Sequence, residues 1–400
     1  MYFAYCADTS ILILSHLFKL LYNASIFNLV DKRVSLYANA IKLIVKRKIQ
    51  PEKAFDLAYK KLKMKESREE LYNQFLHVLQ HFYYNYELYH EDGIEEAVLH
   101  SLDGGKIDLP QWVKERLSYL RIKDFSLLFK KHTWIRVNTL KARMPDVVES
   151  LKRKGFELER DEYDYLYKVL KAPYRISKTE EFQNGKIVIQ DKASVKVVEI
   201  LSPKPGEKIL EIGSAPGMKT SLIQQLTENK AYVIAVDVSE KRIKIQKELM
   251  KKLGVENVEL VLADGKNLPV SQVDKILIDA PCSNSGTLAS DPSVFLRISK
   301  KDVLRLSRLQ REILEEASKL KKPVVYSTCS LFPDEGEKVV EKFADYLVKI
   351  NEDPSHYGYF KSKVWLRVLR FYPHIHGTQG FFIAKLDFSK SPSETRLLKL

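Results

Sequence analysis

Apolar residues recur at three- and four-residue spacing through the first quarter of the chain, as in Ala38, Ile41 and Ile44. The spacing continues in Leu71, Phe75, Val78, Leu79 and Phe82. Such a pattern places the apolar side chains on one face of a helix, so it predicts amphipathic helices in an all-helical domain. Residues 101–105 read Ser-Leu-Asp-Gly-Gly and break the pattern. We therefore predict a helical N-terminal domain over residues 1–105.

The pattern changes after residue 105. Residues 134–138 alternate like a strand, and residues 144–154 have a helical pattern that ends at Gly155, which predicts a small α+β subdomain over 106–185. Further on, strand, turn and helix repeat, with strands expected at residues 208–212, 232–236, 258–262, 275–278 and 324–326. This alternation predicts a Rossmann-like α/β domain over 186–390, with a doubly wound, mostly parallel sheet.

Composition and charge narrow the class of protein. Apolar residues make up 45% and charged residues 30% of the chain, which favours a folded globular protein over a disordered or fibrous one. The net charge of +14 favours a partner rich in phosphate, such as nucleic acid, although a protein rich in Lys and Glu for use at high temperature is an alternative. Residues 11–30 are apolar but interrupted by polar side chains, so we expect a buried helix and no membrane span.

The sequence contains three cysteines, at Cys6, Cys282 and Cys329. So few cysteines argue against a disulfide framework and against a cysteine metal site, and they fit a reducing compartment. We therefore expect a cytoplasmic protein that binds no metal. Two of these cysteines, Cys282 and Cys329, follow predicted strands. A single cysteine is most often an inert buried residue, but two at one sheet edge, each followed by serine, favour a catalytic role.

A small-residue turn follows the first predicted strand of the α/β domain and opens a helix. It consists of Gly213, Ser214, Ala215, Pro216, Gly217, Met218 and Lys219. Small residues allow a ligand to approach the backbone, and the first turn of a doubly wound sheet is a common cofactor site. The turn matches neither the dinucleotide fingerprint nor the P-loop pattern.

Aspartates end three successive predicted strands, at Asp237, Asp264 and Asp279. Asp237 is suited to accept hydrogen bonds from the ribose hydroxyls of an adenosine, and Asp264 is suited to accept one from the adenine amine. Any one of these residues could instead be a turn former or a helix cap, but three in succession favour a ligand site.

Two motifs resemble those of a known family: Asp279-Ala280-Pro281-Cys282-Ser283 and Ser327-Thr328-Cys329-Ser330. Supporting stretches lie at residues 136–141, 189–194, 372–374 and 380–385. Together they resemble the RNA 5-methylcytosine methyltransferases of the Fmu/Sun, RsmB and NOL1/NOP2 family, also called the NSUN family. The resemblance implies a class I S-adenosylmethionine-dependent methyltransferase fold, S-adenosylmethionine as cofactor, and rRNA or tRNA as substrate.

The resemblance also implies roles for individual residues. Cys329 would be the nucleophile and Cys282 would assist product release, a ranking that the chemistry of thiols alone leaves open. The turn from Gly213 to Lys219 would hold the cofactor together with Asp237, Asp264 and Asp279. The family's turn usually has glycine where this chain has Met218. Some members carry a NusB-like N-terminal domain, and residues 1–105 are a candidate for one.

A thiolate fits this chemistry, because addition of a soft nucleophile to C6 of cytosine activates C5 toward an electrophilic methyl group. Asp279 is placed to contact the N3 and N4 edge of the base. Arg136 and Lys141 are candidates for RNA phosphate contacts in the small subdomain. We expect a monomer. The alternatives are an RNA-binding assembly factor that has lost turnover and, less favoured, a DNA methyltransferase.

Overall fold

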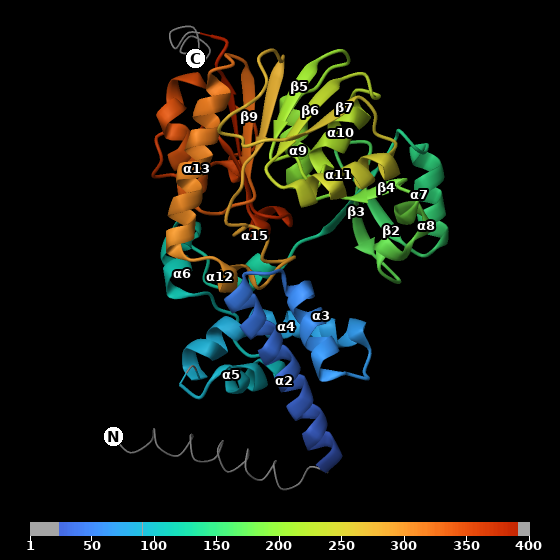
Figure 1. Ribbon diagram of the computed structural model, residues 1–400, viewed down its shortest axis with the longest axis vertical. Helices are drawn as coiled ribbons and strands as arrows, with labels where there is room; N and C mark the ends of the chain where they lie inside the picture. The colour runs from blue at the N-terminus through green and yellow to red at the C-terminus, as the bar shows by residue number, and fades with distance from the viewer. Residues whose placement is uncertain (1–23, 90, 391–400) are drawn as a thin grey trace. The chain divides into compact units, whose positions relative to one another are not determined.

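A computed structural model describes residues 24–89 and 91–390, with side chains described from residue 32 onward. The chain divides into two compact units (Figure 1). The first comprises residues 1–110 together with Asp291–Arg297, and the second comprises Gln111–Ser290 and Ile298–Leu400. Cys6 and most of the helix predicted over residues 11–30 lie outside the described residues. The finer division of the second unit at residue 185 stays a prediction.

The first unit is helical where the structure describes it. Its helices are α2 (Ala24–Arg47), α3 (Pro51–Leu62), α4 (Arg68–Tyr89), α5 (Ile94–Leu102) and the short α12 (Val294–Arg297). Phe75 stacks on Tyr37 and Phe55 at the centre of the unit, with ring centroids 5.5 and 5.6 Å apart. The hydroxyl of Tyr83 donates to the Pro292 carbonyl at 2.9 Å, which ties the late segment to α4. No helix in the described ranges is long and apolar enough to cross a membrane.

The second unit begins with α6 (Gln111–Leu117) and a small antiparallel sheet. The order of its strands is β2 (Glu157–Arg160), β3 (Leu166–Lys171), β1 (Thr133–Val137) and β4 (Ile187–Ile189). Helices α7 (Met144–Arg153) and α8 (Glu180–Gln183) accompany it. Apolar residues of α7 and of the sheet form a separate core that includes Val147, Leu151 and Ile135. The sheet reaches Ile189, past the boundary predicted from the sequence at residue 185.

The larger sheet confirms the predicted doubly wound architecture. Its order is β10 (Leu347–Val348), β12 (Phe381–Asp387), β9 (Pro323–Thr328), β8 (Lys275–Asp279), β5 (Lys208–Ile212), β6 (Tyr232–Asp237) and β7 (Val258–Leu262), with β11 (Leu369–Phe371) on β12. The five strands from β9 to β7 are parallel, and β12 runs antiparallel to β9. Because β5 pairs with β6 on one side and β8 on the other, the strand order reverses beside β5, where ligands bind in such sheets.

Helices cover both faces of this sheet (Figure 1). α13 (Lys300–Ser318) and α14 (Glu337–Val340) pack on one face, against Ile276 and Ile278. α9 (Lys192–Leu201) and α10 (Met218–Leu226) pack on the other, against Leu277. Successive residues of β8 thus point to opposite faces, and both are buried, which explains why this strand is continuously apolar in the sequence. The remaining helices are α11 (Glu240–Leu253) and α15 (Pro373–His376).

A cluster of histidines next to β11 predicts a pH dependence of stability. The rings of His356 and His376 stack with centroids 3.9 Å apart, and burial lowers the pKa of His376 to about 3. Burial also lowers the pKa of His356 and of His374. These side chains stay neutral in the folded protein, whereas the unfolded chain takes up protons below about pH 6.5.

The free energy of unfolding of the full chain should therefore fall by about 1–2 kcal/mol between pH 7.5 and pH 5, a modest loss because the rings are partly exposed. Urea unfolding followed by circular dichroism at both pH values measures it. His376→Asn should reduce the pH dependence, and an equal free energy of unfolding for the native chain at the two pH values would contradict the prediction.

Candidate active site

The two cysteines lie side by side at the carboxyl edge of the larger sheet. β8 and β9 are parallel neighbours, with Asp279 opposite Ser327 in the register. Cys282 and Cys329 follow these paired positions within three residues, so the register brings them together. Their sulfur atoms are 3.1 Å apart, and both side chains are half-buried free thiols. The structure therefore brings together the two cysteines that the sequence singled out.

Asn284 adds a polar group to this pair. The Cys329 thiol donates to its Oδ1 at 2.9 Å, and the Cys282 sulfur lies 3.8 Å from the same atom. Asn284 has a φ of +57°, in the left-handed region that asparagine tolerates better than most residues. The neighbouring Cys329 sulfur and burial raise the pKa of the Cys282 thiol well above its ordinary value. The raised pKa favours the protonated form of the Cys282 thiol.

Asp279 forms a salt bridge at the same edge. The Lys219 ammonium lies 2.6 Å from its Oδ2 and is itself buried, with 7% of the side chain exposed. The Ser327 hydroxyl lies 3.4 Å from Oδ1. Asp279 is thus an acceptor in this geometry, and its contact with the N3 and N4 edge of a base stays a prediction.

The small-residue turn lies where the sequence predicts it, between β5 and α10. The amides of Gly213 and Ser214 both donate to the Val236 carbonyl, and the amide of Gly217 donates to the Ser214 carbonyl. A Cβ at Gly213 would lie 2.2 Å from the Asp279 carbonyl oxygen, and one at Gly217 would lie 2.6 Å from Met250. Both glycines also have positive φ, at +76° and +101°. Both glycines thus accommodate the protein's own backbone and helix α11, and contact of this turn with a cofactor stays a prediction.

The other residues of the turn differ in exposure. Ala215 is buried and its amide donates to Asp237 at 3.2 Å, Pro216 is exposed, and Met218 is half-buried at the first position of α10. Beneath the turn, Glu211 accepts from the Thr220 hydroxyl at 2.6 Å, and burial raises the pKa of Glu211 to about 8. This carboxyl supports the turn from inside the sheet, a role that its place in an apolar strand could have signalled.

Asp237 and Asp264 end neighbouring strands, as predicted, but each also stabilises its own turn. Oδ1 of Asp237 accepts from the backbone amide of Ser239 at 2.9 Å, and Oδ1 of Asp264 accepts from the backbone amide of Lys266 at 3.0 Å. Arg242 lies 3.1 Å from Oδ2 of Asp237, whose side chain is 1% exposed. Asp264 is 45% exposed. Both residues thus match the turn-forming alternative, and their contact with a cofactor stays a prediction.

Arg136 corrects the prediction of an RNA contact. Its side chain is fully buried, and its guanidinium donates to Gln190 at 2.8 Å, to Ser221 at 2.7 Å and to Gln225. It therefore joins strand β1 of the small sheet to α10 of the larger one. Arg136 cannot reach RNA, because three uncharged acceptors hold it inside the protein. Burial lowers the pKa of Arg136 to about 10.

Lys141 is exposed, and its ammonium donates to the Lys252 carbonyl at 3.1 Å, near the end of α11. α11 begins beside Asp237 and has 14 residues, so the two ends of the helix are about 20 Å apart. Lys141 lies next to Lys186 and Lys251 in a basic hollow at the far end. Its contact with RNA stays a prediction.

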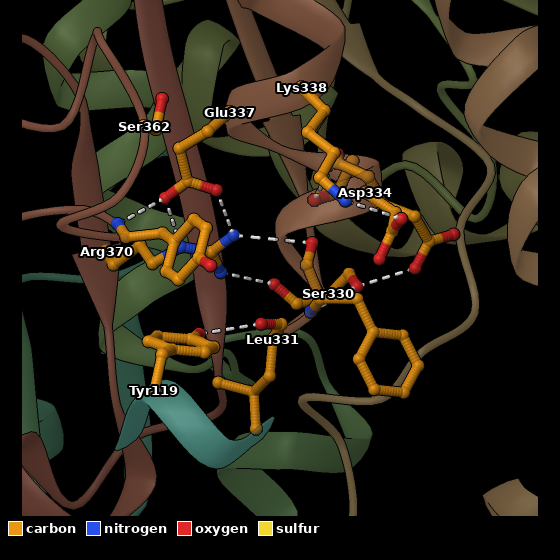
Figure 2. A network of polar contacts seen from close by, with 12 residues as sticks. Tyr119, Ser330, Leu331, Asp334, Glu337, Lys338, Ser362 and Arg370 are labelled. Carbon is orange, nitrogen blue, oxygen red and sulfur yellow. Dashed lines mark hydrogen bonds and ion pairs between the residues drawn. The ribbon is translucent and has the colours of Figure 1, made fainter. Parts of the chain in front are cut away.

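A buried ion pair that the sequence analysis missed holds the segment after Cys329 (Figure 2). Arg370 and Glu337 have no exposed side-chain surface and form two hydrogen bonds of 2.6 and 2.7 Å. Arg370 also donates to the Ser330 carbonyl at 2.9 Å, and the Tyr119 hydroxyl donates to the Leu331 carbonyl at 2.7 Å. An arginine inside the apolar run of β11 was the available signal, because such residues are seldom buried without a partner.

Comparisons with known proteins show the family and the fold. The family model described as 16S rRNA methyltransferase RsmB/F matches residues 198–387. The solved structure of a methyltransferase homolog protein from Pyrococcus horikoshii has a TM-score of 0.60 and 32% identity, over 70% of this chain and 95% of that one. This chain belongs to the RNA 5-methylcytosine methyltransferase family of RsmB and the NSUN proteins. The fold is that of the class I S-adenosylmethionine-dependent methyltransferases, as the resemblance implied.

Curated members of the family include enzymes that act on different RNAs. The human 28S rRNA (cytosine(4447)-C(5))-methyltransferase is 35% identical over 64% of this chain and 34% of its own length. The tRNA (cytosine(72)-C(5))-methyltransferase of Pyrococcus horikoshii is 37% identical over 53% of this chain and 54% of its own length. The chain thus spans about a third to a half of the length of these relatives.

Proposed function

We propose that this chain methylates C5 of cytosine in rRNA or tRNA, using S-adenosylmethionine and a covalent adduct at Cys329. The observation that supports this most strongly is the 3.1 Å distance between the Cys282 and Cys329 sulfur atoms. They lie at the sheet edge where β6, β7 and β8 are each ended or followed by an aspartate. The net charge of +14 suits a phosphate-rich substrate. We further propose that the protein acts as a monomer in the cytoplasm.

The residues present fit the cofactor. The backbone from Gly213 to Lys219 would line its methionine part, with Asp237 on the ribose and Asp264 on the adenine amine. Ribose binding requires that Arg242 share or release the Asp237 carboxylate, because Arg242 lies 3.1 Å from it. Bound S-adenosylmethionine supplies an electrophilic methyl group on a sulfonium centre.

Cys329 carries the covalent step in this proposal. Its thiolate would add to C6, which would make C5 nucleophilic toward the methyl group that bound S-adenosylmethionine would supply. A base such as solvent water would then take the C5 proton, and the electrons of the broken C–H bond would restore the aromatic ring and expel the Cys329 thiolate. Cys282, whose pKa is raised and whose sulfur lies 3.1 Å from that of the nucleophile, would assist that release. Asp279, held by Lys219, accepts from the N4 amino group and orients the base.

Incubation of the full chain with labelled S-adenosylmethionine and unmodified rRNA or tRNA tests the proposal. We expect labelled 5-methylcytosine in nuclease digests of the RNA. RNA binding without any 5-methylcytosine above background would favour an RNA-binding assembly factor that has lost turnover. Preferential labelling of duplex DNA would favour a DNA methyltransferase. Bisulfite mapping of the labelled RNA would then identify the cytosine.

A further inference from the structure

A single buried carboxylate, that of Glu335, is hydrogen-bonded to both cysteine loops. These are the segments after β8 and β9 that carry Cys282 and Cys329. Oε1 of Glu335 accepts from the backbone amide of Ser283 at 2.8 Å. Oε2 accepts from the Ser283 hydroxyl at 2.5 Å and from the Ser330 hydroxyl at 2.6 Å. Ser283 follows Cys282 and Ser330 follows Cys329. The residue next to each thiol is therefore tied to the same side chain.

The carboxylate is itself fixed in place. Glu335 has no exposed surface, and Gln310 of α13 donates both to its Oε1 at 3.3 Å and to the Pro281 carbonyl at 2.8 Å. The Tyr326 hydroxyl donates to the backbone carbonyl of Glu335 at 3.0 Å. The pKa of Glu335 is raised above its ordinary value, because the effect of burial outweighs that of the hydrogen bonds from the serines and Gln310. A strand and a helix thus hold the residue that joins the two loops.

The loops also contact each other directly. The Ser285 and Ser330 hydroxyls are 2.9 Å apart, and Ser285 accepts from the amide of Leu331 at 2.9 Å. Each of these hydroxyls is buried and bonded. These bonds join residues that follow the two thiols closely, so they bear directly on the separation of the two sulfurs.

We propose that Glu335 is a positioning residue that keeps Cys282 and Cys329 within reach of the same base. The inference rests on the proposed function for its biological meaning, but not for its geometry. Without the carboxylate, the two loops lose their shared acceptor and the sulfurs separate. A displacement of about 1 Å at a reacting group can lower turnover by about 100-fold.

Oxidation of the thiol pair measures this positioning without any methyl transfer. In a Cys6→Ser background, diamide should convert Cys282 and Cys329 to a disulfide. Each thiol loses a proton, and the nitrogen–nitrogen double bond of diamide takes up both protons and two electrons. Disulfide geometry is strict, so Glu335→Ala should slow this oxidation by about tenfold or more. Intact-mass spectrometry, with alkylation of the remaining thiols, follows the reaction.

Two variants complete the test. Glu335→Gln keeps an acceptor for the Ser283 amide and a donor for the serine oxygens, so it should oxidise within about threefold of the parent. Glu181→Ala is the matched control, because Glu181 is a buried glutamate that accepts from Ser150 at 2.6 Å within the small subdomain. It should leave oxidation and turnover unchanged. If Glu335→Ala does not fold, Ser330→Ala removes the same link on the Cys329 side.

The outcomes separate the inference from the proposed function. Slower oxidation together with a loss of kcat at constant cofactor KM supports positioning. Slower oxidation in a chain that never methylates RNA still supports positioning and overturns the proposed function alone. Oxidation of Glu335→Ala at the rate of Glu181→Ala overturns the positioning role, whatever happens to turnover.

Discussion

Replacement of Cys329 by alanine is expected to lower methyl transfer on the order of 10⁴-fold or more, since removal of a nucleophile leaves only binding and orientation. The same variant should form no covalent complex with RNA. Both follow because C6 of cytosine would have no thiolate to attack it. Transfer of label from S-adenosylmethionine to RNA, and a denaturing gel of the protein incubated with RNA, are the two measurements.

Replacement of Cys282 separates the roles of the two thiols. Cys282→Ala should still form the adduct but release it slowly, so a protein–RNA species of low mobility should accumulate. Cys6→Ala is the thiol control and should behave like the parent. Accumulation of adduct in Cys329→Ala, with none in Cys282→Ala, would mean that the two roles are exchanged.

Arg370→Met should lower the free energy of unfolding by about 3–5 kcal/mol, because it leaves the Glu337 carboxylate buried without its counterion. The change also removes the donor to the Ser330 carbonyl, 2.9 Å away, so the segment after the nucleophile loses a support (Figure 2). Chemical denaturation of the full chain, followed by circular dichroism, measures the loss.

Two further variants test whether the unpaired Glu337 carboxylate causes the loss of stability. Arg370→Met combined with Glu337→Met should recover most of the lost stability, because no buried charge remains. Arg305→Met is the matched control, since Arg305 has a side chain that is 65% exposed, and its change should stay within about 0.5 kcal/mol. Equal stability of the Arg370 and Arg305 variants would contradict the interpretation of Arg370 and Glu337 as a buried pair.

Much of the fold follows from local pattern. Strands 208–212 and 258–262 were predicted with the bounds that β5 and β7 have, because each is a short, mostly apolar run between turn residues. β5 is buried, whereas β7 at the edge of the sheet is partly exposed. The short strand β4 and the late strands β10 and β11 carry only two or three residues each, too few for a period to appear.

The same distinction holds for the candidate site, where local pattern predicts some residues and long-range contacts decide the others. The sequence by itself placed Cys282, Cys329 and the strand-end aspartates at one edge, because the carboxyl ends of parallel strands meet there. It could not place Arg136, whose burial depends on Gln190 and on residues of α10 that are more than 80 positions away.

Only the tertiary structure decided which polar side chains are buried together. Glu335 and Arg370 carry no local sign of their partners, because hydrogen bonds and ion pairs between distant segments leave no periodic pattern in a sequence. The contact of Arg370 with Glu337 spans 33 positions, and that of Glu335 with Ser283 spans 52. Local pattern determined the sheet and the edge that carries the thiols. Long-range packing determined the 3.1 Å between the two sulfurs and the carboxylate behind them.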